Sequence, residues 1–588
     1  MNNWDLTYLY KDIKSFQEDL DKLPLMINKL ASYAGKLNDE KMFVEYVLLE
    51  DDVEKLLCRT FQYAHLNSDL DKKNVENASY LQKVYFILNN LMQATSFESP
   101  EILSLGKDAV MKIIDNHKEI EPHRFGYEKL FRSNEHVLDG DKEKLLSYFS
   151  AIDGTSGDLY ENLTNADNTP RKIRLKGKGE VIVTQGNWRS LIQEANNPKD
   201  REKVFRAIFD YYDENKNTLA RIYQLGFQMD LANIKARKFD TILDSYLFNN
   251  NIPTSVYLNL VDVASKHNAS LKRYIKLRRK YLGLKTYHTY DRFLELAHSD
   301  KKYSFEQAKE LFFESIKKCP QDFQDKAHEV LKDGFVDVYE KPGKRSGAYS
   351  SSQPDLHPFI LLNYNDTLDD VFTVAHESGH SIHTLYSLES QPSQLQSYTI
   401  FVAEIASTFN EHMLLDYLMS SKELTKDEKI MLLQKEIDEI ASTFYRQTLF
   451  AQYELEVSKL IEKQEPISHE TLSNIMIKLY KKYYGLDITK EKVKQYVWAY
   501  IPHLFRSPFY VYQYATSFAA SFALYDNVKK GKPNAFENYV NLLKSGGSKY
   551  PIIQTKEAGI DLTNKDTFMA VVRRLDELVD SLAKVLGE

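Results

Sequence analysis

The stretch of the chain that decides its fold and its chemistry is His376-Glu377-Ser378-Gly379-His380, which has the pattern H-E-x-x-H. On a helix, residues four apart lie on one face, so the two imidazoles can hold one zinc ion together. The glutamate after the first histidine then lies beside the water that a bound zinc activates, where it can accept a proton. The pattern predicts a zinc hydrolase if the flanking residues form a helix.

The flanking residues predict that helix. Residues 367–370, Thr-Leu-Asp-Asp, have the S/T-x-x-D/E pattern of a capping box and precede the apolar run 371–375. Ile382, Leu385 and Tyr386 continue the apolar positions beyond the motif. We therefore expect the motif in the middle of a helix that packs one side into a core.

A third protein ligand has to come from elsewhere, because a catalytic zinc takes three protein ligands and keeps one position open. His383 lies on the same helical stripe as the motif histidines. Three side chains on one straight stripe span about 10.5 Å, so they cannot easily surround a tetrahedral ion. A ligand from a second helix has better geometry. The nearby candidates are His383, Glu389, Glu404, Glu411 and His412.

Residues 400–411 predict this second helix. Glu404 and Glu411 are seven residues apart, on one face but two turns distant, so at most one of them binds the zinc. A carboxylate on an otherwise apolar helix face needs a partner, which favours Glu404. The alternative for Glu404 is a structural ion pair.

Several stretches together resemble one known family. Residues 376–383 are followed by Phe401-Val-Ala-Glu-Ile-Ala-Ser-Thr408, and further matching stretches cover residues 4–6, 343–349, 357–364, 501–503, 509–515 and 557–561. With these residues the chain resembles oligoendopeptidase F, which belongs with the thimet-oligopeptidase-like zinc metallopeptidases. The resemblance implies that the helix carrying Glu404 supplies the third zinc ligand.

The oxyanion that forms when water attacks a peptide carbonyl needs a donor besides the metal. Nothing near the motif provides one, so we expect it from the C-terminal segment. The resemblance implies that this segment lines the cleft opposite the zinc and that its histidine and tyrosines bind substrate or stabilise the intermediate. Tyr512 best matches the family position that stabilises the oxyanion, and core packing is the alternative for any one tyrosine. The candidates are His503, Tyr510, Tyr512 and Tyr514.

One departure from the family pattern follows the Ile-Pro-His sequence. Family members commonly carry a tyrosine soon after it, whereas this chain has Leu504-Phe505-Arg506. The departure leaves one auxiliary hydroxyl in question. Arg506 is a candidate partner for a substrate carboxylate, and His383 is expected to support the site or pack rather than bind the metal.

Composition predicts a large, mainly α-helical protein. A chain of 588 residues exceeds the usual size of a single core, so we expect at least two lobes. Only 21 Gly and 16 Pro favour long helices over many turns. We predict an N-terminal helical lobe with a short hairpin over residues 1–196 and a catalytic lobe over residues 197–588. The resemblance implies that the first lobe closes over the second around a deep cleft or channel.

The remaining patterns predict local elements. Amphipathic helices are expected at 47–66 and 78–91, a hairpin at 172–183, and strands at 335–339 and 359–362. We propose the last strand, with Phe359, Ile360 and Leu361, as the cleft edge on which an extended peptide pairs. The alternative is an interior strand that only packs.

Charge and cysteine content narrow the partners and the compartment. A net charge of −7 and a pI near 6.2 give no electrostatic case for binding nucleic acid. Cys58 and Cys319 provide no disulfide framework and suggest a reducing compartment. No signal peptide and no apolar run of membrane length are visible, so we expect no membrane partner and a cytoplasmic location. The oligomeric state cannot be predicted.

These features together predict a zinc endopeptidase that acts on short peptides. One zinc per chain would be held by His376, His380 and Glu404, with Glu377 as the general base. Two alternatives remain, namely another zinc hydrolase such as an aminopeptidase, and a helical scaffold that binds peptides without catalysis. Cleavage of an N-terminally blocked peptide separates the two enzymes.

Overall fold

The computed structural model describes residues 3–138, 140–149, 152, 154–422 and 424–588. Contacts divide the chain into two compact units, each made of three separate stretches. Unit 1 comprises Met1–Glu135, Lys301–Ser420 and Leu524–Ile560, and unit 2 comprises His136–Asp300, Ser421–Ala523 and Asp561–Glu588. The predicted lobes, 1–196 and 197–588, divide the chain along its sequence, whereas these units combine early and late segments. The division into the lobes 1–196 and 197–588 stays a prediction.

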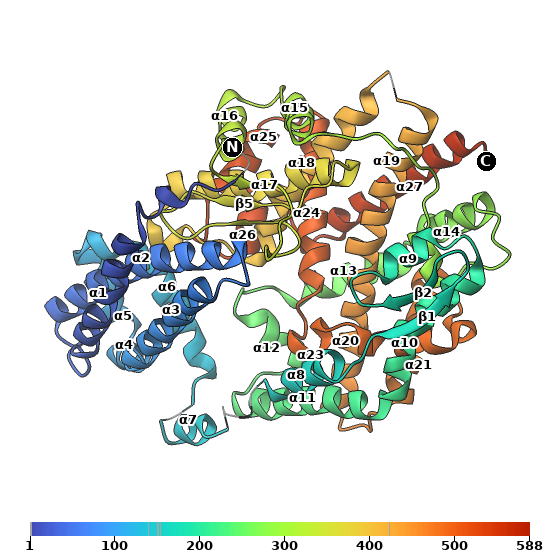
Figure 1. The fold of residues 1–588 in the computed structure, drawn as a ribbon. Helices are drawn as coiled ribbons and strands as arrows, with labels where there is room; N and C mark the ends of the chain where they lie inside the picture. The colour runs from blue at the N-terminus through green and yellow to red at the C-terminus, as the bar shows by residue number, and fades with distance from the viewer. Residues whose placement is uncertain (1–2, 139, 150–151, 153, 423) are drawn as a thin grey trace. The chain divides into compact units, whose positions relative to one another are not determined.

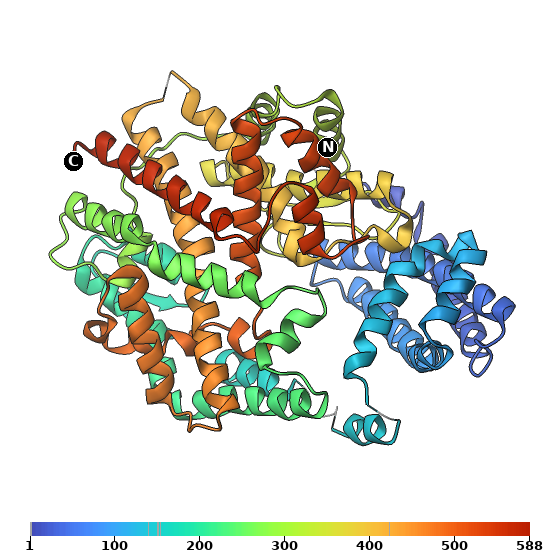
Figure 2. The ribbon, with the colours of Figure 1, turned by 180° about the vertical axis from the view of Figure 1, so that it is seen from behind.

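Unit 1 begins with three long helices, α1 (Ile13–Ala31), α2 (Glu40–Leu70) and α3 (Val75–Ala94), drawn in blue in both views (Figure 1, Figure 2). Asp12, Asp39 and Asn74 cap their N-termini by accepting hydrogen bonds from backbone N–H groups. The amphipathic helices predicted at 47–66 and 78–91 are confirmed as parts of α2 and α3.

The other helices of unit 1 are shorter, apart from the two that carry the H-E-x-x-H motif and the predicted third ligand. Those two are α17 (Leu368–Ser390) and α18 (Ile400–Ser420). The remaining helices are α4 (Glu98–Leu105), α5 (Lys107–Asn116), α6 (Arg124–Ser133), α15 (Phe305–Ser315), α16 (Gln321–Val330), α25 (Ala535–Lys544) and α26 (Pro551–Glu557).

A small sheet in unit 1 lies just before α17 in the chain. Its strands are β3 (Val336–Asp337), β4 (Tyr349–Ser351) and β5 (Phe359–Leu361), in the order β3-β5-β4. β5 pairs parallel to β3 and antiparallel to β4. Trp4 contacts the same sheet, because its Nε1 donates a hydrogen bond of 2.8 Å to the Ile360 carbonyl.

The prediction that β5 is an edge strand is wrong. Phe359, Ile360 and Leu361 are at most 1% exposed, and strands flank them on both sides. Three consecutive apolar residues bury both faces of the sheet, as in an interior strand, so the packing alternative applies. The edge on this side is β4, whose residues are half-buried.

Unit 2 contains the predicted hairpin, formed by β1 (Arg171–Leu175) and β2 (Gly179–Val183) in an antiparallel pair. Gly177 and Gly179 have φ angles of 82° and 76°, so the chain turns at glycines as predicted.

Helices form the rest of unit 2 (Figure 1), together with two 3-10 segments, η6 (Thr289–Phe293) and η9 (Ile488–Tyr496). α24 (Tyr512–Lys529) continues from unit 2 into unit 1. The other helices are α7 (Gly140–Ser147), α8 (Thr155–Glu161), α9 (Trp188–Glu194), α10 (Pro198–Glu214), α11 (Lys216–Ala236), α12 (Ile242–Phe248), α13 (Thr254–Lys266), α14 (Ala269–Tyr281), α19 (Lys426–Glu439), α20 (Arg446–Glu462), α21 (His469–Tyr484), α22 (Val497–Tyr500), α23 (His503–Arg506) and α27 (Lys565–Leu586).

The predicted fold class, mainly α with a small β element beside the motif helix, is confirmed. Within the described ranges, no helix is both long enough and apolar enough to span a membrane.

Candidate metal centre

The helix that carries the motif begins where the sequence predicts. The Thr367 hydroxyl accepts a hydrogen bond of 3.2 Å from the Asp370 N–H, and the Asp370 carboxylate accepts one of 2.9 Å from the Thr367 N–H. This reciprocal capping box fixes the first turn of α17. Ile382 and Tyr386 are at most 1% exposed, so the motif lies mid-helix with its apolar side in the core.

A glycine lets the second helix approach the motif. A Cβ atom at Gly379 would lie 2.5 Å from the Ala406 carbonyl oxygen and 2.6 Å from the Ser407 Cα, both backbone atoms of α18. No other residue fits there without moving one of the helices. The Asn410 side-chain amide ties the same two helices by donating a hydrogen bond of 3.1 Å to the Ala375 carbonyl.

This approach brings three potential metal ligands together. Nε2 of His376 and Nε2 of His380 lie 3.4 Å and 3.5 Å from the same oxygen of Glu404. Among the described residues, these three form the cluster that could hold a metal ion, with ligand atoms within 4.8 Å of one another. Tetrahedral zinc with bonds of about 2.0–2.2 Å separates its ligand atoms by about 3.3–3.6 Å. The donor set therefore suits zinc with a fourth position left open.

Groups outside the ligand cluster contact each of the three ligands. Nδ1 of His376 lies 2.6 Å from a carboxylate oxygen of Glu411, and the Ala403 backbone acts on the His380 ring to raise its pKa. The Ser407 hydroxyl donates a hydrogen bond of 2.9 Å to the Glu404 carboxylate. Such outer contacts fix ring orientation and tautomer, which aims the free nitrogen at the metal.

The two histidines have opposite proton affinities. Burial acts to lower the pKa of His376, but the hydrogen bond and charge of Glu411 outweigh it and raise the pKa to about 10. For His380, burial and then the positive charge on His376 lower the pKa to about 4. His380 is therefore neutral at pH 7, as a metal ligand must be, and a metal has to displace a proton from His376.

Glu377 lies in the setting of a general base. It is 6% exposed, and burial raises its pKa to about 7, against the opposing charge of His376. The Ser350 backbone in β4 acts to lower this pKa slightly, and Oε2 of the carboxylate has no hydrogen-bond partner among the described residues. A carboxylate poised near neutral pH can accept a proton and return it.

His383 takes no part in the ligand cluster. It is fully buried, and its ring stacks on Tyr398 with centroids 3.6 Å apart and planes 7° apart. Burial and the charge of His380 lower its pKa to about 3, so it is a neutral packing residue. This agrees with the expectation that it supports the site or packs rather than binds the metal.

The C-terminal candidates belong to unit 2, where three of them form one group. The His503 ring stacks on Tyr510 with centroids 6.0 Å apart and meets Tyr514 at 6.2 Å, and all three residues are half-buried. Tyr512 is 3% exposed, and its ring packs 5.0 Å from that of Tyr257. Its placement favours the core-packing alternative, and its predicted role with the oxyanion stays a prediction.

The segment that carries these tyrosines is held by a buried acid that sequence reasoning missed. Phe509 has a φ of 54°, which is unfavourable for a bulky residue, and its N–H donates a hydrogen bond of 2.7 Å to Glu454. Arg506, the candidate for a substrate carboxylate, pairs with Glu161 at 2.8 Å in the same unit.

Other functional residues were only partly foreseen. Glu411 was considered as an alternative ligand, whereas the structure makes it the partner of His376. Its spacing of seven residues from Glu404 was a usable signal, because both acids lie on one face of α18. Nothing in the local sequence indicated the contact between Ser350 and Glu377, which depends on the strand order of the sheet.

Known proteins resemble the chain over almost its full length. Residues 191–573 match the model of peptidase family M3, and residues 101–169 match a model described as oligopeptidase F. Oligopeptidase PepF of Bacillus subtilis (strain 168) is 33% identical over 588 residues, which cover 100% of this chain and 87% of that protein.

Solved structures share the fold. The crystal structure of oligoendopeptidase-F from Enterococcus faecium is 28% identical and aligns with a TM-score of 0.76, covering 98% of this chain and 99% of that one. A crystal structure from Chlamydophila abortus is 30% identical and aligns with a TM-score of 0.90, covering 99% of this chain and 98% of that one.

Proposed function

The chain belongs to peptidase family M3, and on that premise we propose that it is a zinc-dependent endopeptidase that cleaves internal bonds of short oligopeptides. Membership confirms the family resemblance predicted from the sequence and makes the chain a metallopeptidase that hydrolyses oligopeptides. The identity of the metal, the mechanism and the roles of individual residues are the proposal.

The observation that carries the proposal is the ligand triangle beside a poised carboxylate. His376 and His380 lie 3.4 Å and 3.5 Å from Glu404, separations that suit zinc. When bound, zinc polarises a substrate carbonyl and lowers the pKa of a water molecule. Glu377 is next to the first ligand in the chain and has a pKa of about 7.

The protein's own groups then do the proton transfer. Glu377 accepts the proton of the attacking water and delivers it to the leaving amine, which makes it both general base and general acid. Glu411 holds the His376 ring, so that the ligand set keeps its geometry while the proton moves.

β4 is the proposed place for an extended substrate. Ile360 of β5 donates its N–H to the Phe335 carbonyl at 2.8 Å, on the side away from β4. In an antiparallel ladder, its counterpart Ser350 then points its own main-chain groups away from β5, toward the free edge. A peptide pairing there would lie along the strand whose Ser350 backbone acts on the pKa of Glu377.

The half-buried group of His503, Tyr510 and Tyr514 is the proposed source of further donors to the substrate. An imidazole and two phenols supply the N–H and O–H groups that a developing oxyanion needs. For Tyr512, the proposal requires that a hydroxyl on a ring only 3% exposed reaches the substrate.

The predicted compartment and partners stay predictions. Cys58 and Cys319 are free thiols in the structure, which fits the predicted reducing, cytoplasmic location. Short peptides are the proposed partners. The absence of nucleic-acid and membrane partners also stays a prediction.

Hydrolysis of an N-terminally blocked, quenched-fluorescent peptide of about eight residues tests the proposal. The zinc-loaded chain is compared with Glu377→Gln. Glu389→Gln serves as the control, because Glu389 lies on the same helix, α17, but pairs with Lys326 of α16. We expect internal cleavage by the native chain and by the control, with products identified by mass. In Glu377→Gln, cleavage should be lost while zinc is retained. No cleavage by the fully zinc-loaded native chain would contradict the proposal.

A further inference from the structure

A pocket in unit 2, separate from the metal centre in unit 1, is lined by four basic side chains. Its cavity volume is small, about 10 Å³, or the space of about one water molecule, and the pocket opens to solvent. Lys494 is 7% exposed, and Arg292 and Arg446 are half-buried. The basic residues are Arg189, Arg292, Arg446 and Lys494, and aromatic rings complete the wall.

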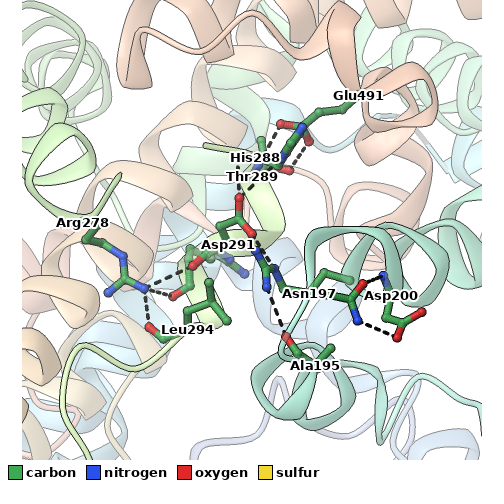
Figure 3. Close-up of polar contacts among 11 residues, drawn as sticks. Ala195, Asn197, Asp200, Arg278, His288, Thr289, Asp291, Leu294 and Glu491 are labelled. Carbon is green, nitrogen blue, oxygen red and sulfur yellow. Dashed lines mark hydrogen bonds and ion pairs between the residues drawn. The ribbon is translucent and has the colours of Figure 1, made fainter. Parts of the chain in front are cut away.

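The acids beside this pocket are already engaged by other donors. The Glu491 carboxylate accepts hydrogen bonds from the Thr289 N–H at 2.7 Å and the Thr289 hydroxyl at 2.6 Å (Figure 3). Asp291 forms a buried ion pair of 2.8 Å with Arg201 and accepts the His288 N–H at 2.8 Å. Glu491 acts on Lys494 only through its charge, and no carboxylate forms an ion pair with any of the four basic groups among the described residues.

A neighbouring arginine, Arg278, has most of its donors engaged within the chain, although its buried Nε has no partner among the described residues. Arg278 is completely buried, and its guanidinium donates to the carbonyls of Asp291, Arg292 and Leu294 (Figure 3). In contrast, the charged ends of the four pocket residues make no hydrogen bond within the described part of the chain. Their N–H donors are therefore available to a ligand.

Aromatic rings compensate these charges only in part. Lys494 Nζ lies 4.9 Å from the centre of the Phe209 ring, and the Arg292 guanidinium lies 4.5 Å from that of Phe293. A contact of this kind contributes about 0.5–2 kcal/mol, but it uses none of the directional N–H donors. The rings hold the cations in place, and the N–H donors of the cations stay free to form hydrogen bonds.

The positive charges also act on one another. Burial, then the charges of Arg446 and Arg189, lower the pKa of Arg292 to about 10. Burial and the charge of Arg446 likewise lower the pKa of Lys494, against the opposing charge of Glu491. A group of like charges in such surroundings is destabilising unless an anion neutralises it.

We propose that this pocket binds a phosphate-type oxyanion. Three guanidinium groups and one ammonium group provide the planar forks and point charge that recognise tetrahedral oxyanions. The four side chains line one pocket, and among the described residues no carboxylate lies at ion-pair distance from their charged ends. The site is distinct from the metal centre, so it does not depend on the proposed function.

Isothermal titration calorimetry of the full chain with inorganic phosphate, in low-salt zwitterionic buffer, tests the proposal. We expect binding by the native chain and a dissociation constant at least about tenfold weaker in Arg446→Gln and Lys494→Met, since each loses a charge-assisted contact. Arg221→Gln is the matched control, because Arg221 is exposed and bonded only to Gln224 in its own helix. It should bind phosphate like the native chain.

Thermal unfolding distinguishes a variant that has lost phosphate binding from one that has lost stability. Without phosphate, Arg446→Gln and Lys494→Met should unfold at a temperature equal to or higher than the native chain, because each removes an uncompensated charge. Phosphate should then stabilise the native chain more than either variant. Variants that unfold earlier, yet respond to phosphate as strongly as the native chain, would overturn the proposal.

Two further results would overturn it. One is the absence of any heat at millimolar phosphate with the folded native chain. The other is binding that persists in Arg446→Gln and disappears in His380→Ala, which would place the anion at the metal centre. Titration with adenosine monophosphate identifies the source of the phosphate group. Tighter binding than inorganic phosphate indicates a larger phosphorylated ligand that contacts the rings, and equal affinity indicates the free oxyanion.

Discussion

The metal centre and the basic pocket carry excess charge of opposite sign. At the metal centre, Glu377, Glu404 and Glu411 surround two imidazoles, and the excess charge is negative. At the pocket, four basic groups face one acid that other donors occupy, and the excess charge is positive. Charge of one sign that the chain itself leaves uncompensated predicts a ligand of the other sign.

The two regions also differ in how the chain assembles them. The metal centre comes from two helices that follow each other in sequence, α17 and α18. The pocket collects its basic side chains from α9, η6, α20 and η9, which are spread from Arg189 to Lys494. A spacing motif can therefore encode the first region, whereas only the folded chain brings the second together.

Removing a metal ligand should have the largest effect. It should disable the metal centre and leave the basic pocket unchanged. In Glu404→Ala, the cluster keeps two imidazoles and loses the oxygen to which both are close. We expect loss of bound zinc and a fall in peptide hydrolysis of at least about a thousandfold. Zinc content by mass spectrometry and the rate with the blocked peptide check this, and phosphate binding at the pocket should be unchanged. Full zinc content in this variant would contradict the ligand assignment.

Pushing the two helices apart should have the next largest effect. Gly379→Ala places a methyl group 2.5 Å from the Ala406 carbonyl oxygen, so α17 and α18 must separate. We expect a loss of stability of about 1–3 kcal/mol and weaker zinc binding. Gly126→Ala is the control, because a Cβ there meets nothing within 4 Å. Equal unfolding temperatures and zinc affinities for the two variants would show that the close approach is not required.

The sequence predicts features that neighbouring residues encode better than features that depend on contacts between distant elements. Periodicity and capping residues are local, so α17, α18 and the start at Thr367 could be predicted, and spacing favoured Glu404. The order of strands is not local, because an apolar run such as Phe359–Leu361 suits either an edge or a centre until its neighbours are known.

The unforeseen parts of the site depend on contacts between elements. The approach of α18 to Gly379 and the contact of Ser350 with Glu377 exist only after helix and sheet have packed. The basic pocket had no signal at all, since its residues are far apart in sequence and basic residues usually face solvent.

Removing the carboxylate that orients a metal ligand should have a smaller effect than removing the ligand itself. In Glu411→Gln, the His376 ring loses a charged partner at 2.6 Å. We expect zinc affinity to fall about 10–100-fold, with hydrolysis largely restored at saturating zinc. Competition with a zinc-binding dye measures the affinity. An unchanged affinity would mean that the carboxylate does not position the ring.

A buried acid with no counter-ion among the described residues gives a third case, in which a bound proton removes the charge. Burial raises the pKa of Glu454 to about 8, and the Phe509 N–H is the hydrogen-bond donor to it. Since the folded chain holds this proton longer than the unfolded chain, stability should fall as pH rises from about 4.5 to 8, by up to about 1.4 kcal/mol per pH unit.

Glu454→Gln isolates this contribution. The variant keeps a hydrogen-bond acceptor for Phe509 and cannot ionise, so its stability relative to the native chain should rise as pH increases through this range. Urea unfolding at several pH values gives the difference between the two chains. A difference that does not change with pH would show that Glu454 does not retain its proton in the folded state.

X-ray absorption at the zinc edge of the native chain tests the central claim, that two consecutive helices hold one zinc through His376, His380 and Glu404, most directly. The account predicts one zinc per chain with two imidazole nitrogens at about 2.0–2.1 Å and the remaining ligands oxygen. Scattering from three imidazoles would mean that His383 has left its stack on Tyr398 to bind the metal, and it would contradict the account.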